Sequence, residues 1–328
     1  MRLRWPAFVM ALGALTAACA TDPQRDQEQN HAMDLLYESL FADRPFHLDC
    51  TDRWPGKPLP PGVHAWVTSS NQPPYTFSRL DTLNLPRAYV PAITLVSVPE
   101  ASVNISIEGV AREDWELRLC AQGTGDSEEE ARNYLNKVSM NRIGSLVTLD
   151  SGGFGPIPLT GGRGHLVVEA PAIAPVTIHN TFGAIAIHDM AGAVSLSSAH
   201  ARVSILSTTG NVDASAFVID FAGAKGAVML NAVDDVNIKL TAPQFEGRLS
   251  ASAQRTVRVF VPRGFKGPIE ATVNQPKNFV CRADLCGKMQ KKKNGGRYSF
   301  TYAGGGAAAS NQISLSSEFA NVVIDNAE

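Results

Sequence analysis

A repeat of nine residues runs through the middle of the chain and constrains its fold more than any other feature. Five successive units carry apolar residues at the same two positions, which is more regularity than chance would give. These pairs are Val176/Ile178, Ile185/Ile187, Val194/Leu196, Val203/Ile205 and Val212/Ala214. After a shift of two residues in phase, the pattern continues at Ile219/Phe221 and Val228/Leu230.

Each unit is expected to be a short strand followed by a tight turn. Two apolar residues separated by one residue bury one face of a strand. The position four residues after the first apolar residue is small and polar, and the position seven residues after it is often glycine. These residues are Asn180, Asp189, Ser198 and Ser207, and Gly183, Gly192, Gly210 and, after the phase shift, Gly226. Glycine at these turns would supply the positive φ that other residues resist.

The unit is too short to be a complete coil. Nine residues cannot close around a packed interior, so two or more units must form one turn of a β-solenoid, with a period near 18 or 27 residues. Successive turns would pair as parallel strands about 4.8 Å apart. An antiparallel meander could use the same lengths, but its turns would have no reason to repeat in kind. The sequence therefore predicts a mostly β fold, a single-chain β-solenoid resembling a parallel β-helix, with regular repeats over residues 175–240.

Further strands are expected on the N-terminal side of the repeats. Alternating apolar residues predict them at Ile93–Val98, Val103–Ile107, Trp115–Leu119, Leu146–Leu149 and His165–Glu169. Charged residues make up 18% of the chain, below the roughly 25% of an average soluble domain. The 27 glycines and 20 prolines also favour many short elements.

One helix is expected over about residues 127–142. Ser127 and Glu130 form a capping box, and apolar residues then follow at intervals of three and four. The helix should end between Asn141 and Gly144. This helix and the Lys-rich segment 288–293 would cap the two ends of the solenoid, which would otherwise aggregate.

The first twenty residues are typical of an export signal. Two arginines precede an apolar run that ends at Ala18 and is too short for a permanent membrane helix. Residues 15–19, Leu-Thr-Ala-Ala-Cys, resemble the lipobox of bacterial lipoproteins, which implies removal of residues 1–18 and acylation of Cys19. Because Ala20 follows the cysteine, the resemblance also implies the outer membrane. Ordinary signal-peptidase cleavage after Ala20 is the competing interpretation.

Three segments of the chain are therefore distinguished. Residues 1–18 form the signal peptide, residues 19–92 the lipid anchor, tether and Pro-rich region, and residues 93–327 the β-solenoid domain. Eight prolines between positions 55 and 91 predict irregular structure with little regular pairing over residues 52–91.

Four cysteines remain after Cys19, and export places them in an oxidising compartment. Cys281 and Cys286 flank a short segment typical of a turn between strands, so we expect them to form one disulfide. Cys50 and Cys120 would then form the second. A metal site is the rival use, but Cys-x-x-Cys units are missing and no histidine lies near the close pair.

The pattern of residues 93–327 resembles the bacterial putative-adhesin family, a group of envelope proteins of unknown function. The resemblance rests on residues 103–107 and 114–117, on the Ser127–Val138 helix and, above all, on the units from Val176 to Leu230. It implies a β-solenoid in the cell envelope with no established activity or ligand, and it carries over no functional residues.

Three sets of polar residues are candidate sites. His179 and His188 occupy the same position in successive units, but with two units per coil they would lie on different faces, over Ser197 and Leu206, so a metal site is not expected. The adjacent pair Asp234-Asp235 favours a turn over a catalytic carboxylate cluster. Lys291-Lys292-Lys293 could contact anionic lipid or glycan, but a solvated turn is the favoured interpretation.

The sequence thus predicts a non-enzymatic cell-envelope lipoprotein that presents a solenoid surface for binding or scaffolding and is held on the membrane by its lipid anchor. No catalytic residue, cofactor or metal is expected, and an envelope protein or a glycan could be the partner. The net charge of −2 offers nothing to nucleic acid. The alternatives are a carbohydrate-active β-helix enzyme and a solenoid that polymerises end to end.

Overall fold

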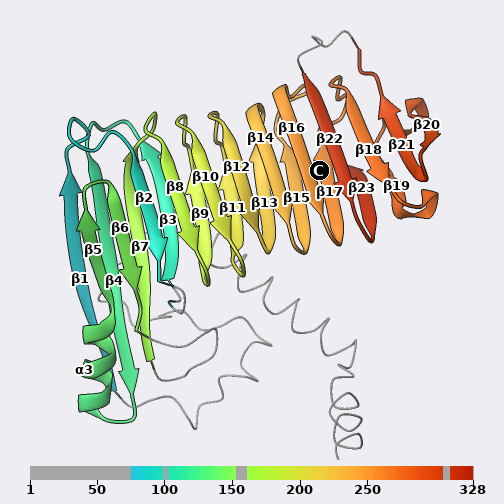
Figure 1. The fold of residues 1–328 in the computed structure, drawn as a ribbon. Coiled ribbons are helices and arrows are strands. Elements are labelled where there is room, and N and C mark those ends of the chain that lie inside the picture. The colour runs from blue at the N-terminus through green and yellow to red at the C-terminus, as the bar shows by residue number, and fades with distance from the viewer. Residues whose placement is uncertain (1–74, 99–100, 102, 153–160, 306–310, 328) are drawn as a thin grey trace, which may run out of the picture. The chain divides into compact units, whose positions relative to one another are not determined.

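The computed structural model describes residues 75–327, apart from 99–100, 102, 153–160 and 306–310 (Figure 1). The expected signal peptide, the tether, Cys19 and Cys50 lie outside the described residues, as do residues 52–74 of the Pro-rich region.

The described residues form two large sheets and one α-helix, α3 (Glu128–Lys137). No helix among them is long and apolar enough to cross a bilayer. Sheet A contains, in spatial order, β1 (Tyr75–Leu85), β4 (Trp115–Gly125), β7 (Gly161–Pro171), β3 (Val103–Val110), β9 (Ala184–His188), β11 (Arg202–Leu206), β13 (Val218–Gly223), β15 (Asp235–Leu240), β17 (Thr256–Val261), β23 (Asn321–Asn326) and β19 (Phe279–Cys281). Sheet B contains β20 (Gln290–Asn294), β21 (Arg297–Tyr302), β18 (Ile269–Val273), β22 (Gln312–Ser317), β16 (Glu246–Ala253), β14 (Lys225–Ala232), β12 (Val212–Ala216), β10 (Val194–Ser198), β8 (Val176–Asn180), β2 (Ile93–Ser97), β6 (Leu146–Asp150) and β5 (Ser139–Ile143).

The nine-residue units are strands that alternate between the two sheets (Figure 1). Val194 pairs in parallel with Val176 before it and with Val212 after it, each two units away along the chain. After the phase shift, Val212 pairs with Val228, so that repeat is slightly shorter. The shorter of the two expected periods is therefore correct. The antiparallel meander is excluded from β8 to β17, where the strands within each sheet are parallel neighbours.

The two sheets share one core. In β10, Val194, Leu196 and Ser198 are buried, whereas Ser195 and Ser197 are exposed. The same alternation recurs along both sheets, and the inward residues of both belong to a single cluster of buried apolar side chains. Burial of a Val, Leu or Ile side chain stabilises the fold by about 1.5–3 kcal/mol, so this cluster is the main source of stability.

A series of glycines lies where the chain passes from sheet A to sheet B, in the turn or at the second residue of the next strand. A Cβ atom on Gly192 would lie 2.3 Å from the carbonyl oxygen of Ala174, and a Cβ on Gly210 would lie 2.1 Å from that of Gly192. Gly226 and Gly247 continue the series, each against the previous glycine. Positive φ was expected at Gly183, Gly192, Gly210 and Gly226, and Gly183 (112°) and Gly226 (126°) have it. At Gly192 and Gly210 that expectation is wrong, because close approach of the neighbouring turn requires glycine there.

The first described strand, β1, contradicts the expectation of irregular structure. It pairs antiparallel with β4 along its whole length, from Tyr75 to Leu85. The reason is that no proline interrupts residues 75–85, since the prolines of this region lie at positions up to 74 and again at 86. Strand β7 also begins at Gly161, earlier than expected, and pairs with both β4 and β3.

Helix α3 begins as predicted and ends early. Ser127 is the N-cap, and its side chain accepts a hydrogen bond from the Glu130 backbone N–H. The helix ends at Lys137, because Val138 is already extended, and residues 139–143 form β5 instead. The expected end between Asn141 and Gly144 is therefore wrong. The β5 strand pairs with β6, which satisfies backbone groups that a longer helix would have used.

Replacing Ser127 by alanine is expected to lower the free energy of unfolding by about 1 kcal/mol, because the Glu130 N–H loses the acceptor at 3.1 Å. Urea denaturation followed by circular dichroism would measure the change. The control is Ser204→Ala on β11, which removes a hydroxyl from a strand. Equal stability of the two variants would contradict the capping role.

The last strands return into the body of the molecule. After β17 the chain forms β18 and β19 and the β20–β21 hairpin, and then comes back as β22 and β23. Strand β22 lies between β16 and β18, and β23 lies between β17 and β19. The β22–β23 pair is therefore flanked on both sides by strands that precede it in the sequence.

The predicted disulfide between Cys281 and Cys286 is confirmed, with 5.7 Å between the Cα atoms. Cys120 is also disulfide-bonded. Its expected partner Cys50 lies outside the described residues, so that pairing stays a prediction. The Lys291–Lys293 segment is not a turn but the middle of β20, which pairs antiparallel with β21. The turn of this hairpin is Gly295-Gly296, both with positive φ.

Candidate binding face

The outward side of sheet B carries two rows of mainly small polar residues, which we call the hydroxyl face. The rows follow from the strand register, because outward positions of neighbouring strands lie side by side. The first row is Thr177, Ser195, Asp213, Met229, Ser250 and Ser314, and the second is His179, Ser197, Ser215, Asn231, Ser252 and Ser316. All are exposed or partly exposed, and all except Met229 present polar groups to solvent, most of them hydroxyls.

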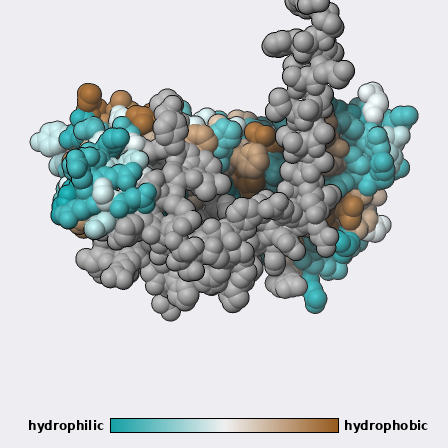
Figure 2. Space-filling model, turned by 90° about the horizontal axis from the view of Figure 1, so that it is seen from below, coloured by the Kyte–Doolittle hydropathy of each residue, from teal (hydrophilic) through white to brown (hydrophobic). Residues whose placement is uncertain are grey.

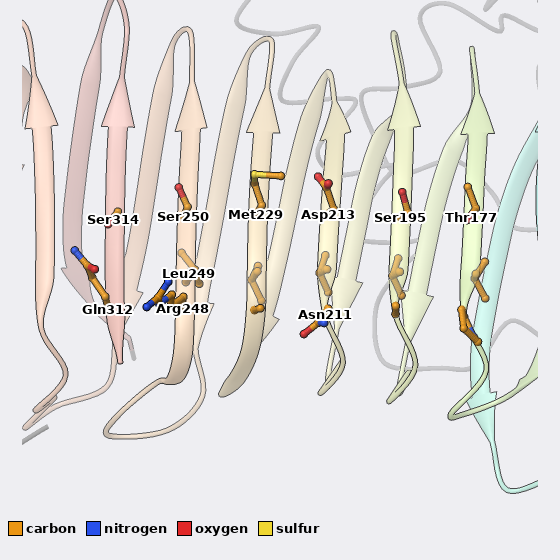
Figure 3. A pocket seen from close by; sticks show the side chains of 17 residues that line it. Thr177, Ser195, Asn211, Asp213, Met229, Arg248, Leu249, Ser250, Gln312 and Ser314 are labelled. Atoms are coloured by element: carbon orange, nitrogen blue, oxygen red, sulfur yellow. The ribbon is translucent and has the colours of Figure 1, made fainter. Parts of the chain in front are cut away.

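A hollow of about 540 Å³ lies along the first row (Figure 3). A third row of residues, each two positions before a first-row residue in the sequence, forms the other side of the hollow. Three of them, Pro175, Ala193 and Ala227, have short side chains. Arg248 and Gln312, which pair in register, are the long side chains at the β16–β22 end. The hollow therefore results from small side chains over several strands, with a cation and an amide at one end.

A second hollow of about 330 Å³ continues along the second row. Ser252 and Ser316 line it, and each lies two residues beyond a lining residue of the first hollow on the same strand. Its far side is formed by Asn274, Arg297 and Glu318. The side-chain amide of Asn274 donates to the backbone carbonyl of Glu318. From β8 to β18 the two hollows span seven strands, or about 29 Å at the usual strand spacing.

The side chains that line the two hollows are mainly uncharged, and many of them can donate or accept hydrogen bonds. Asp213 is the one carboxylate lining the larger hollow, and Glu318 the one lining the smaller hollow, among the described residues. Hydrolysis of a glycoside commonly uses two carboxyl groups about 5–9.5 Å apart on one site. No group of three or more His, Cys, Asp and Glu residues with the geometry of a metal site occurs in the described part.

The two repeat histidines lie where the two-unit coil predicts them. His179 on β8 pairs with Ser197, and His188 on β9 pairs with Leu206, so the imidazoles belong to different sheets. His179 is exposed on the hydroxyl face. Burial lowers the pKa of His188, although the charges of Asp189 and Glu108 act in the opposite direction. Nothing brings the two imidazoles onto one ligand.

The Asp234-Asp235 pair serves the structure. Asp234 lies in the turn before β15 and Asp235 begins that strand, as the preference for a turn implied. The guanidinium of Arg255 binds both carboxylates, with 2.7 Å between its Nε and Asp234 Oδ1. Burial and the negative charge of Asp235 raise the pKa of Asp234. The sequence analysis did not identify Arg255 as the partner of these carboxylates. Its position one repeat after the aspartate pair could have indicated this ion pair.

The hollows were also not identified from the sequence. The outward Ser, Thr, Ala and Asn residues were recognisable there, but Met229, Arg248 and Gln312 join them only through the strand register. Arg248 and Gln312 pair although they are far apart in the chain, so no local pattern indicates their contact.

No family model matches the chain, and no curated protein matches it. Solved structures do match at low identity. A putative cell adhesion protein from Clostridium sporogenes is 8% identical, with 77% of this chain and 100% of that chain covered and a TM-score of 0.32. A putative adhesin from Bacteroides fragilis is 8% identical, with 75% and 97% covered and a TM-score of 0.34. A putative adhesin from Parabacteroides merdae is 9% identical, with 58% and 92% covered and a TM-score of 0.24. These proteins carry the description of the family that the sequence resembles, and no residue is assigned from them.

Proposed function

We propose that this protein is a non-enzymatic, adhesin-like lipoprotein of the cell envelope, whose hydroxyl face binds an extended, largely uncharged ligand such as a glycan chain. In this proposal the two sheets are the walls of a β-solenoid, and the chain is a member of the putative-adhesin group. Support comes from the parallel pairing of every second unit and from the turns that alternate between the sheets.

The single observation that carries the proposal is the pair of neighbouring hollows on the hydroxyl face. Both hollows are lined by hydroxyl and amide groups. Each also has one guanidinium, that of Arg248 in the larger hollow and that of Arg297 in the smaller one. Such groups form hydrogen bonds with sugar hydroxyls, and an array along several strands can bind successive units of one chain. The isolated carboxylates Asp213 and Glu318 favour binding over hydrolysis.

Filling the larger hollow is expected to weaken this binding strongly. The double variant Ser195→Arg and Ser250→Arg places two long side chains in the first row, where serine now lines the hollow. Its retention on purified cell-wall polysaccharide and on a glycan array should fall at least tenfold. The matched control is Ser204→Arg on β11 in sheet A. Equal retention of the filled variant and the control would refute the binding role.

The enzymatic and self-assembling alternatives have their own measurements. Release of reducing ends from the bound polysaccharide by the unmodified protein would show that the carbohydrate-active alternative is correct. Sedimentation over a range of concentrations tests polymerisation, and a concentration-independent monomer would exclude it. Arg142 on β5 and the lysines of β20 place positive charge at both edges of sheet B, which disfavours joining of one end to the other.

The lipid anchor and the outer-membrane location belong to the same proposal. They are supported by the lipobox-like residues 15–19 and by Ala20 after the cysteine. The variant Cys19→Ser should lose the mass of the acyl groups and should leave the membrane fraction when membranes are washed in high salt, which screens contacts between charges. An unchanged mass and an unchanged membrane fraction would contradict lipidation.

A further inference from the structure

The β20–β21 hairpin, at the end of sheet B, concentrates positive charge. Residues 275–305 contain seven basic residues and one acidic residue, a balance of +6, although the whole chain carries −2. We call five of these residues the basic end: Lys288, Lys291, Lys292, Lys293 and Arg297. All five are exposed. In Figure 2, teal dominates the right-hand end of the molecule, where Figure 1 places the hairpin.

This charge is not neutralised within the described part of the chain. None of the five residues forms an ion pair with another described residue, whereas the nearby Arg282 pairs with Asp325 at 2.7 Å. The carboxylate of Glu270, on the neighbouring β18, accepts a hydrogen bond from the Ser299 hydroxyl at 3.0 Å. The basic end therefore presents a positive potential to solvent.

Two of the lysines, Lys291 and Lys293, lie over aromatic rings that pack against the core. Phe300 stacks on Phe279 with 3.9 Å between ring centroids. The Lys291 ammonium lies 5.2 Å from the ring centroid of Tyr298 and 5.9 Å from that of Phe300. The Lys293 ammonium lies 5.7 Å from the Tyr298 ring. The stems of these lysines can cover the rings while the charged groups stay in water.

The charges also lie on both faces of the hairpin. Along a strand, successive side chains point to opposite faces, so Lys292 faces away from Lys291 and Lys293. A cleft that follows a polymer chain would place its cations on one side. Cations on both sides of an edge strand instead suit an edge-on approach to a broad, flat, negatively charged surface. Lysine, a compact point charge, fits such a surface better than it fits a shaped anion site.

We propose that the basic end binds the surface of a bilayer that contains anionic phospholipids. This contact does not involve the expected anchor at Cys19. It shares one residue, Arg297, with the smaller hollow of the hydroxyl face, and the test below leaves Arg297 unchanged. Each lysine near an anionic bilayer contributes about fivefold to the partition coefficient, and the contribution is screened by salt. With the hairpin on the bilayer, the long axis of the two sheets would be attached at this end as well as through the N-terminal segment.

The test compares full-length variants that all carry Cys19→Ser, so that no acyl group contributes to binding. Partitioning is measured by flotation with vesicles of phosphatidylcholine alone and of phosphatidylcholine with phosphatidylglycerol. The first variant is K291E/K292E/K293E, and the second is K291Q/K292Q/K293Q, which retains long side chains over the aromatic rings. The control K225E/K239E/K266E changes the net charge by as much as the glutamate variant does, but at three other exposed lysines. Thermal unfolding shows that each variant is folded.

We expect the background protein to prefer the anionic vesicles and to lose this preference in 1 M salt. The glutamine variant should bind them about 100-fold more weakly, and the glutamate variant at least as weakly, while the control changes less than threefold. Equal binding to neutral and anionic vesicles, or unchanged binding of the folded glutamine variant, would overturn the proposal. Binding to dextran sulfate, a soluble polyanion, is measured in parallel. If the glutamine variant loses this binding but binds the vesicles as the background protein does, the hairpin binds soluble polyanions and the bilayer proposal is overturned.

Discussion

Replacing Gly210 by alanine is expected to lower the free energy of unfolding by about 3 kcal/mol. The new Cβ would lie 2.1 Å from the carbonyl oxygen of Gly192 and 2.6 Å from that of Ala191. Both atoms are backbone, so no side-chain rotation relieves the contact, and the two turns must move apart. That movement strains the hydrogen bond of 2.8 Å from the Thr209 N–H to the Met190 carbonyl. Urea denaturation at neutral pH measures the loss.

The control for this prediction is Gly287→Ala. Nothing lies within 4 Å of a Cβ atom at Gly287, and its φ is not positive, so the substitution should change stability by less than about 0.5 kcal/mol. If Gly210→Ala were as stable as the control, the close stacking of the turns would be incorrect. The effect of Gly192→Ala should be similar, because the same contact is made one repeat earlier.

Acidification is expected to destabilise the protein through His165. This side chain on β7 is 6% exposed, and burial lowers its pKa from 6.5 to about 4. Below pH 6.5 the unfolded chain binds a proton that the folded protein does not bind until about pH 4. Stability is therefore fully present above 6.5 and falls as the pH decreases to about 4, by about 3 kcal/mol for a shift of this size.

The measurement is the difference in unfolding free energy between the unmodified protein and His165→Gln from pH 7.5 to 4. Carboxylates contribute equally to both proteins, so the difference isolates the histidine. The variant should lose about 3 kcal/mol less than the unmodified protein over this range. The matched control is His179→Gln, which makes the same substitution at an exposed imidazole. A difference that does not vary with pH would contradict the neutral, buried state of His165.

The repeat was predictable because its information is local. Alternating Val, Ile and Leu residues define the strands, and the equal lengths of the units require neighbouring repeats to pair in register, as Val194 and Val212 do. The residues that pair with His179 and His188 were also predictable, because each lies two units further along the chain. The function of the glycines was only half predictable, because the close approach of Gly210 to Gly192 exists only once two repeats are stacked.

Strand β1 was missed because its less exposed face is not apolar along its whole length. Phe77, Leu83 and Leu85 alternate with polar residues, but Arg79 and Asp81 occupy the same face. These two form an ion pair at 2.8 Å, and Arg79 also donates to the backbone carbonyl of Val138 at 2.7 Å. The ion pair allows two charged residues to occupy a strand face, and no sequence periodicity shows it.

Strand β20 was missed because it has no apolar residue. Its sequence, Gln-Lys-Lys-Lys-Asn, is typical of a solvated turn, and all five residues are exposed. It is a strand because β21 pairs with it and because Tyr298 and Phe300 lie beneath the lysine stems. The hollows on the hydroxyl face have the same kind of origin, since they depend on partners far apart in the chain.

The position of β22 and β23 has a consequence for the order of folding. The position between β16 and β18 is occupied by β22, and the position between β17 and β19 is occupied by β23. Both strands follow the β20–β21 hairpin in the sequence. Growth of the stack by simple addition of repeats, from the first to the last, must therefore stop at β17. In the final step β22 pairs with β16, and the whole intervening segment forms the loop between them. Because this loop is long, we expect this pairing to be the slowest step of folding. Until it is complete, β16 and β17 expose unpaired edges, and an exported chain would be most open to chaperones and proteases at this stage.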